Sequence, residues 1–291
     1  MNRIQRKPSW LRAEMLGASN TAHLTKMLSE YKLHTVCESA RCPNRGECFE
    51  RGSAVFLIMG NECTRNCRFC AIPTTVHAEP LDPDEPRRIA EMSKELGLKH
   101  VIITSVTRDD LADGGADHFR KTIQEVRDLL GNEVYIEVLT PDFKGDKKAI
   151  DIVADEEPTI FNHNIETIHR LYPTIRPQAD YDRSLSLLKR VKQTHPAIRT
   201  KTGIMVGLGE SKPEVIQVME DARNAGVDMM TIGQYLQATT KNYPVQEYIH
   251  PHVFDEYRKD GMDMGFLYIE SAPLVRSSYY STDLSTILQN K

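Results

Sequence analysis

The chain has 291 residues, of which 40% are hydrophobic and 27% charged, a composition that suits one large domain or two small ones. Its net charge of −4 gives no basic field that would attract nucleic acid, so we expect no nucleic-acid partner. The opening segment MNRIQRKPSWLRAEMLG lacks the apolar core of a signal peptide, and no run approaches the roughly 18 apolar residues of a membrane span. We therefore expect a cytoplasmic protein.

Residues 1–53 form a polar leader, and from residue 54 onward short apolar runs alternate with segments of helical spacing. The apolar runs are rich in β-branched residues and nearly continuous, as strands buried on both faces are. The predicted strands are 54–60, 100–106, 134–139, 159–164, 200–207 and 228–233, and the predicted helices are 83–97, 117–130, 146–155, 180–194 and 212–225. Ser211 and Pro213 are a cap residue and a tolerated early proline at the start of the last helix.

This alternation predicts an α/β protein with parallel strands and helices outside them. A TIM-like barrel, complete or partial, and an open doubly wound sheet both satisfy it. Polar residues follow every predicted strand, which suits a ring of loops around one mouth better than a single crevice. The pattern therefore favours a barrel, and these segments are CTRNC, TRDD, TPD, NHNIE, GLGE and QYLQ.

All six cysteines lie between Cys37 and Cys70. A disulfide framework usually staples distant parts of a small secreted domain, whereas this chain is large and concentrates its thiols in one segment. The distribution favours metal binding over disulfides.

The segment CTRNCRFC places Cys63, Cys67 and Cys70 directly after the first predicted strand. A structural zinc site needs a fourth ligand, for which His77 is a candidate, although this spacing is not a common zinc spacing. Thiolates also bind iron–sulfur clusters, and a cubane held by three cysteines leaves one iron open to a small molecule. With Phe69 before the last cysteine, the segment resembles the radical S-adenosylmethionine superfamily. In that superfamily the open iron binds S-adenosylmethionine, and the [4Fe-4S] cluster supplies the electron that generates a 5′-deoxyadenosyl radical.

A second set, Cys37, Cys42 and Cys48, has the spacing C-x4-C-x5-C. Zinc binding or structural packing would explain it, but its proximity to the first set favours a second cluster. Both cysteine sets together resemble the lipoyl synthase family. The resemblance extends over nearly the whole chain through KPSWLR, VCESARCPNRGEC, TSVTRDDLADGGADHF, FNHNIET, RSLSLL, TKTGIMVGLGE, TIGQYLQ and VRSSY.

The resemblance implies a partial (β/α)6 TIM-like barrel with three parts. These are an N-terminal extension with auxiliary-cluster ligands (1–53), the barrel (54–270) and a C-terminal tail with the RSSY motif that closes over the mouth (271–291). It also implies that the auxiliary cluster has a serine as its fourth ligand. Two serines near a C-terminus are by themselves more typical of turns or caps. We prefer Ser278 over Ser277, and an alkoxide, being harder than a thiolate, suits a cluster that is opened.

The implied activity is insertion of two sulfur atoms, at C6 and C8, into an octanoyl chain held as an amide on a lysine of a carrier domain. The sulfur donor is the auxiliary [4Fe-4S] cluster. Implied partners are the E2 subunits of 2-oxoacid dehydrogenases, the H protein of glycine cleavage, an electron donor such as ferredoxin or flavodoxin, and a cluster-assembly carrier. The alternatives are another radical S-adenosylmethionine enzyme that uses the second cluster for electron transfer, and a metal-binding interaction module without turnover.

Candidate contacts to S-adenosylmethionine lie at the ends of two predicted strands. Asn162 and Asn164 share a face, with Glu166 beyond them, and suit the ribose hydroxyls, although a self-satisfied turn is as good an explanation. The hydroxyls of Thr104 and Ser105 suit the methionine amino group.

Three residues depart from the family pattern. Gln178 stands where glycine is common, Ala238 where proline is common and Asn242 where histidine is common. All three lie in predicted loops near the mouth, which leaves the carrier contacts open.

Overall fold

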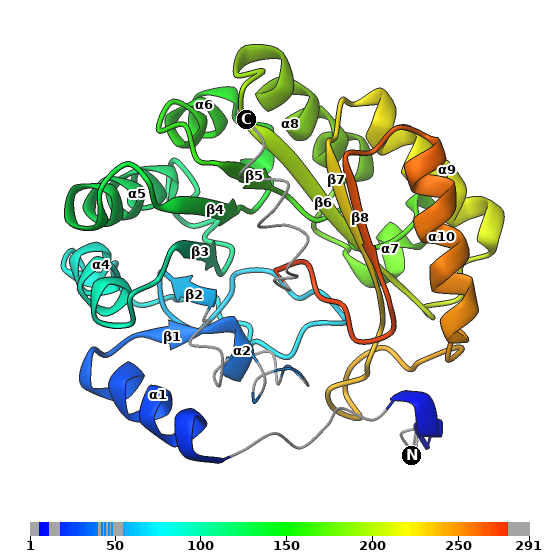
Figure 1. Ribbon diagram of the computed structural model, residues 1–291, viewed down its shortest axis with the longest axis horizontal. Helices are drawn as coiled ribbons and strands as arrows, with labels where there is room; N and C mark the ends of the chain where they lie inside the picture. Colours follow the sequence, from blue (N-terminus) through cyan, green and yellow to red (C-terminus); the bar gives the residue numbers. More distant parts are fainter. Residues whose placement is uncertain are drawn as a thin grey trace.

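The protein forms one open sheet whose strands follow one another in chain order (Figure 1). The computed structural model describes residues 6–11, 18–39, 42, 44, 46, 48 and 55–278. Within these residues the sheet has eight strands; β1 is antiparallel to β2, and every other neighbouring pair is parallel. The strands are β1 (His34–Thr35), β2 (Val55–Ile58), β3 (His100–Ser105), β4 (Tyr135–Leu139), β5 (Ile160–Asn162), β6 (Arg199–Val206), β7 (Met229–Gln234) and β8 (Tyr268–Ser271).

Helices surround the convex side of the sheet as an outer arc (Figure 1). The helices that follow successive parallel strands are α4 (Glu85–Glu95), α5 (Ala116–Leu130), α6 (Lys147–Ala154), α8 (Tyr181–Thr194), α9 (Lys212–Asn224) and α10 (Pro251–Asp263). Shorter elements complete the described chain: α1 (Ala18–Glu30), α2 (Val36–Ser39), α7 (Tyr172–Ile175) and the 3-10 turns η1 (Ser9–Leu11), η2 (Phe143–Gly145) and η3 (His169–Leu171). Within the described part of the chain, no helix is both long and apolar enough to cross a membrane.

The sequence explains why these elements form. β2 and β7 are buried along their whole length, so their continuous apolar runs face helices on one side and the barrel interior on the other. On α5 the residues Phe119, Ile123 and Val126 are fully buried at helical spacing and form the face packed on the sheet. The expected start of α9 is confirmed: Ser211 and Glu214 form a reciprocal capping box, with Pro213 in the first turn.

The partial barrel predicted from the sequence is confirmed, and the sheet extends beyond the six predicted strands. β1 and β8 form its two edges, so the barrel is not closed. The pattern missed both α10 and β8. Gly261 inside α10 resembles a helix breaker, but it allows close approach to β8, because a Cβ there would lie 2.7 Å from Ile269. β8 itself spans only four residues, too few for a clear periodic signal.

Candidate functional site

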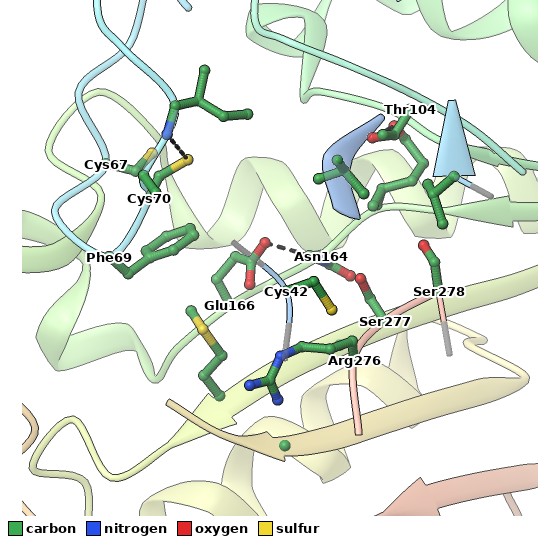
Figure 2. A pocket seen from close by; sticks show the side chains of 18 of the residues that line it. Cys42, Cys67, Phe69, Cys70, Thr104, Asn164, Glu166, Arg276, Ser277 and Ser278 are labelled. Atoms are coloured by element: carbon green, nitrogen blue, oxygen red, sulfur yellow. Dashed lines mark hydrogen bonds between the residues drawn. The ribbon is translucent and has the colours of Figure 1, made fainter. Parts of the chain in front are cut away.

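A cavity of about 540 Å³ opens at the C-terminal ends of the parallel strands. Loops after β2, β3, β4, β5 and β7 line it, together with residues of β6, α2, parts of the N-terminal extension and the segment after β8. All six cysteines line this one cavity, and Figure 2 shows Cys67 and Cys70 on one side and Cys42 beside the tail residues Arg276, Ser277 and Ser278. The two cysteine sets, separate in the sequence, therefore line one cavity. The predicted cluster ligands in its lining are Cys37, Cys42, Cys48, Cys63, Cys67, Cys70 and Ser278.

The cysteine loop, residues 63–70, is tied to the loop that follows β3. The backbone N–H of Thr64 donates to the carbonyl of Thr107 at 3.0 Å, and the Thr64 hydroxyl donates to the same oxygen at 2.9 Å. The N–H of Asp109 donates to the Thr64 hydroxyl at 2.9 Å. The N–H of Cys63 donates to the carbonyl of Pro73 at 2.9 Å, which closes the base of the loop. These contacts fix the first cysteine against the end of β3.

Arg65 anchors the same loop through contacts with two carboxylates. Its guanidinium, almost fully buried, bonds both oxygens of Asp109 at 2.6 and 2.9 Å and Asp142 at 2.7 Å. Arg183 contacts the other oxygen of Asp142 at 2.8 Å. Although burial opposes ionisation, these hydrogen bonds hold the pKa of Asp142 well below its usual range. A planar guanidinium with several fixed donors suits this two-carboxylate contact, which lysine could not reproduce.

The sulfur atoms of the cysteine loop accept hydrogen bonds from the backbone. The N–H groups of Thr107 and Arg65 donate to Cys63 Sγ at 3.3 and 3.4 Å, and that of Ile72 donates to Cys70 Sγ at 3.4 Å (Figure 2). Burial raises the pKa of Cys70 to about 12. Burial also raises the pKa of Cys67, which the charge of Arg176 partly offsets.

The described thiols do not converge on one point. Cys37, Cys42, Cys63, Cys67 and Cys70 are free thiols. Among the described residues, no three His, Cys, Asp or Glu side chains converge as the ligands of a single metal ion do. Cysteines on a cubane each bind a different iron and so lie farther apart than the ligands of one ion. Iron–sulfur clusters are held by cysteine thiolates, and hydrogen bonds to the sulfur atoms tune their reduction potential.

The N-terminal extension meets the tail at this cavity. Cys37 lies in α2, where burial raises its pKa to about 12, and Cys42 and Cys48 line the cavity beside it. Asn44, between them, donates from Nδ2 to the carbonyl of Leu274 at 2.7 Å. In Figure 1 the segment after β8 turns across the mouth toward α2. Asn44, which lies between Cys42 and Cys48 in the sequence, thus joins the N-terminal part of the chain to the tail.

Two glycines on neighbouring strands seat the tail. A Cβ on Gly233 of β7 would collide with the carbonyl of Val275, and one on Gly203 of β6 would lie 3.3 Å from Ser277 Cβ. The backbone N–H of Gln234 donates to Pro273 at 3.2 Å and that of Ala272 to Ile232 at 3.2 Å. The tail therefore approaches the strands closely only because both positions lack a side chain.

Most of the predicted cosubstrate contacts line the cavity. Thr104, Ser105, Asn164 and Glu166 do so, and Figure 2 shows Asn164 and Glu166 joined by a hydrogen bond of 3.0 Å. Burial raises the pKa of Glu166, against the effect of Arg176. Its backbone φ of +69° is held by hydrogen bonds to Gly203 and Met205 on β6. A non-glycine residue in this conformation is typical of functional sites.

Asn162 lies outside the cavity that the described residues form. It is fully buried one layer deeper, where Nδ2 donates to Glu137 at 3.0 Å. Lys201 contacts the same carboxylate at 3.0 Å. Asn162 and Asn164 therefore both point inward, but only Asn164 reaches the cavity. Asn162 belongs to the strand, and Asn164 to the loop beyond it.

The sequence did not single out several polar groups of the cavity wall. His163, Thr140 and Arg176 line it, and each has a buried polar atom without a partner among the described residues. Ser105 and Asn164 have such atoms too. Buried polar atoms are normally paired, so these groups are available to hydrogen-bond a polar ligand or water. In the sequence, only a position after a predicted strand could have indicated that these residues line the site.

The three departures from the family pattern all lie at the mouth. Ala238 lines the cavity. Gln178 and Asn242 instead contact the backbone of the cysteine loop, at Asn66 and Cys70.

Comparison with known proteins agrees with this geometry. Residues 57–222 match the radical SAM superfamily. Two solved structures share the fold, although their sequence identities are low. One is methylornithine synthase (PylB), with a TM-score of 0.54 and 15% identity over 78% of this chain and 74% of that one. The other is Streptococcus suis SuiB bound to S-adenosylmethionine, with a TM-score of 0.58 and 13% identity over 82% of this chain and 57% of that one.

Curated relatives are much more similar in sequence. A lipoyl synthase of Caldanaerobacter subterraneus is 54% identical over 95% of this chain and 96% of its own length. A lipoyl synthase of Alkaliphilus metalliredigens is 49% identical over 96% of each chain. The chain therefore belongs to the radical S-adenosylmethionine superfamily and, within it, to the lipoyl synthase family.

Proposed function

We propose that this chain inserts two sulfur atoms, at C6 and C8, into an octanoyl group bound to a lysine of a carrier domain. One observation carries the proposal: both cysteine sets line the same cavity, together with the serine tail. A reaction that joins sulfur to unactivated carbon needs a hydrogen-abstracting group and a sulfur source within reach of one substrate. The similarity to lipoyl synthases over nearly the whole chain supports this function over a different radical enzyme.

In this proposal Cys63, Cys67 and Cys70 hold a [4Fe-4S] cluster that binds S-adenosylmethionine. A second [4Fe-4S] cluster is held by Cys37, Cys42, Cys48 and Ser278. When bound, the first cluster with its cosubstrate supplies one-electron chemistry, and the second supplies sulfur. The backbone N–H groups that face Cys63 and Cys70 support thiolate sulfur at these positions.

The polar wall of the cavity suits S-adenosylmethionine. Ser105 and Asn164 offer buried atoms without partners, and the Thr104 hydroxyl donates to the carbonyl of Leu139 at 2.9 Å, which leaves its lone pairs as acceptors. Glu166 accepts hydrogen bonds from the side chain of Asn164 and suits hydroxyl donors of the ribose. Asn162, which lies in the layer below the cavity, supports this wall indirectly, because it and Lys201 both bind Glu137.

The remaining wall suits the acyl chain. The lining also includes the apolar residues Val106, Leu139, Ile204, Met205 and Leu236. An apolar lining packs against an alkyl chain and restricts its motion, which helps to hold the reacting carbon in place.

Ser278 is the serine that we assign to the second cluster. Ser277 lies against Gly203, since a Cβ added to that glycine would be 3.3 Å from Ser277 Cβ, and so has a structural contact of its own. An oxygen ligand is harder than the thiolates around it and suits a cluster that gives up sulfur. Replacement of Ser278 by alanine should lower sulfur insertion more than replacement of Ser277.

The wider context follows from this function. We propose the division into an extension (1–53), a barrel (54–270) and a tail (271–291), and a cytoplasmic location, which the clustered free thiols support. The partners are octanoylated carrier domains of 2-oxoacid dehydrogenase E2 subunits and of the glycine cleavage H protein. A ferredoxin or flavodoxin supplies electrons, and a cluster-assembly carrier restores the second cluster.

The test uses anaerobically purified, reconstituted protein with dithionite, S-adenosylmethionine and an octanoyl-lysyl peptide. Mass spectrometry should find the peptide with two added sulfurs and about two 5′-deoxyadenosines per product. A variant with Cys37, Cys42 and Cys48 replaced by alanine should still form 5′-deoxyadenosine but add no sulfur. Cosubstrate cleavage without sulfur gain, in protein with an intact second cluster, would contradict the proposal.

A further inference from the structure

Two amide side chains from outside the cysteine loop hold its backbone at both ends. Near the start of the loop, the N–H of Asn66 donates to Gln178 Oε1 at 2.7 Å, and Gln178 Nε2 donates to the carbonyl of Thr64 at 3.4 Å. At the end, Asn242 Nδ2 donates to the carbonyl of Cys70 at 2.7 Å and to that of Arg68 at 3.3 Å. Backbone groups of three loop residues besides Cys70 are thus fixed by the two side chains.

Asn242 is itself oriented by its own loop. Its Oδ1 accepts from the backbone N–H of Thr239 at 3.0 Å and from the Thr239 hydroxyl at 2.7 Å. Gln237 Nε2 donates to the Asn242 carbonyl at 3.1 Å. With its oxygen occupied, the side chain has only the Nδ2 end to turn toward the cysteine loop.

A second contact pairs the same two segments. The N–H of Tyr243 donates to the carbonyl of Arg68 at 2.8 Å, and the Arg68 guanidinium lies over the Tyr243 ring, 5.5 Å from its centre. On the other side, the N–H of Arg68 donates to the carbonyl of Ile175 at 2.9 Å. The loop is therefore held between the segment after β7 and the C-terminal end of α7.

We propose that Asn242 and Gln178 are positioning residues that fix the spacing of Cys63, Cys67 and Cys70 for the cluster they hold. Neither side chain supplies a ligand. Each restricts the motion of the cysteine loop through hydrogen bonds to its backbone. Loss of contacts that orient metal ligands typically changes metal affinity or activity by about 10- to 100-fold. The inference rests on the proposed iron–sulfur site and deepens it.

The experiment uses the full chain with Cys37, Cys42 and Cys48 replaced by alanine, so that iron reports on one cluster. Asn242→Asp keeps the oxygen that accepts from Thr239 but removes the donor to Cys70, and Asn242→Ala removes both without adding charge. Gln178→Ala tests the other end. Lys241→Ala is the matched control, because that side chain is exposed on the same loop.

Two readouts are independent of turnover: the rate of iron loss to a chelator, and the electron paramagnetic resonance signal of the reduced cluster. Both Asn242 variants should lose iron about 10-fold faster and show an altered signal, Gln178→Ala should lose it a few-fold faster, and Lys241→Ala should match the parent. Iron loss by both Asn242 variants within twofold of the parent, with an unchanged signal, would overturn the inference.

A parent chain that binds no iron would count against the proposed function instead. Hydrogen exchange of the apo chain then decides the inference. The Asn66 amide should exchange about 10-fold faster in Gln178→Ala, and the Cys70 amide, which donates to Cys67, faster in Asn242→Asp. Unchanged exchange at both amides would contradict it.

Discussion

Asn44 Nδ2 and the carbonyl of Leu274 are joined by a 2.7 Å hydrogen bond, although 230 positions separate them. Asn44 lies among the N-terminal cysteines, and Leu274 precedes the serines of the tail. This contact connects the two ends of the described chain across the cavity.

Asn44→Asp should loosen the tail, because it places a carboxylate against a carbonyl where an amide now donates. We expect a loss of about 1–2 kcal/mol in the free energy of unfolding. Hydrogen exchange at the Val275 amide, which donates to Ala272, should become faster. Asn132→Asp, at an exposed position, is the control and should change neither quantity. A protected Val275 amide in Asn44→Asp would show that this contact does not hold the tail.

Gly233→Ala should displace the tail from β7. The new methyl group would collide with the Val275 carbonyl, which is backbone and cannot rotate away, and such overpacking costs about 1–3 kcal/mol. The Ala272 amide, bonded to Ile232, should lose protection in hydrogen exchange, and the second cluster should retain less iron.

The control for this change is Gly97→Ala. Gly97 has φ +63° with open space around it, so alanine there adds backbone strain of about 1 kcal/mol without touching the tail. Equal exchange at Ala272 in both variants would mean that the tail responds to stability alone.

Arg65→Met should destabilise the protein by about 3 kcal/mol, because it leaves Asp142 buried with Arg183 as its remaining charged contact. Urea unfolding at pH 7 measures the loss. Arg87→Met is the matched control, since the Arg87–Glu91 pair is exposed and should contribute less than about 1 kcal/mol. Similar losses in the two variants would argue against an anchoring role for Arg65.

His163 should make the apo protein less stable in mild acid. Burial lowers its pKa to about 4, so below pH 6.5 the unfolded chain takes up a proton that the folded chain refuses. Its stabilising contribution is therefore full above pH 6.5 and is lost as the pH falls toward 4, at up to about 1.4 kcal/mol per pH unit. Urea unfolding between pH 7 and pH 4 measures this slope.

His163→Asn keeps a donor for the Thr140 carbonyl, which now bonds Nδ1 at 2.9 Å, and should reduce the slope. Part of the slope should remain, because burial also lowers the pKa of His100 to about 4. His77→Asn, at an exposed position, should leave the slope as it is. An undiminished slope in His163→Asn would assign the acid sensitivity to other groups.

The sequence predicts the part of the fold that repeats. Buried parallel strands are continuous apolar runs, so 100–106 and 228–233 correspond to β3 and β7, and polar residues after them place the mouth. The position of the cysteines directly after a predicted strand places the thiols at that mouth, and the sequence alone is enough to see it. These signals are local, and they suffice for the barrel and for the two thiol sets.

What the sequence leaves out depends on distant packing. Nothing near Gly233 indicates that it faces the Val275 carbonyl, and nothing near Asn242 indicates a bond to Cys70. Asn162 is a further example. It points to the same side as Asn164, as the sequence predicts, but its hydrogen bond to the buried Glu137 places it below the cavity. Such roles arise only when separate segments meet.

The contact between Asn44 and Leu274 also sets an order of events during synthesis. Chains emerge from the ribosome N-terminus first, so the N-terminal cysteines and most of the barrel exist before the tail does. Until Leu274 has been made, Asn44 lacks this acceptor and the cavity lacks one wall. A chamber that residues 275–278 help to line reaches its final shape only after they emerge, so its completion follows the synthesis of the whole barrel.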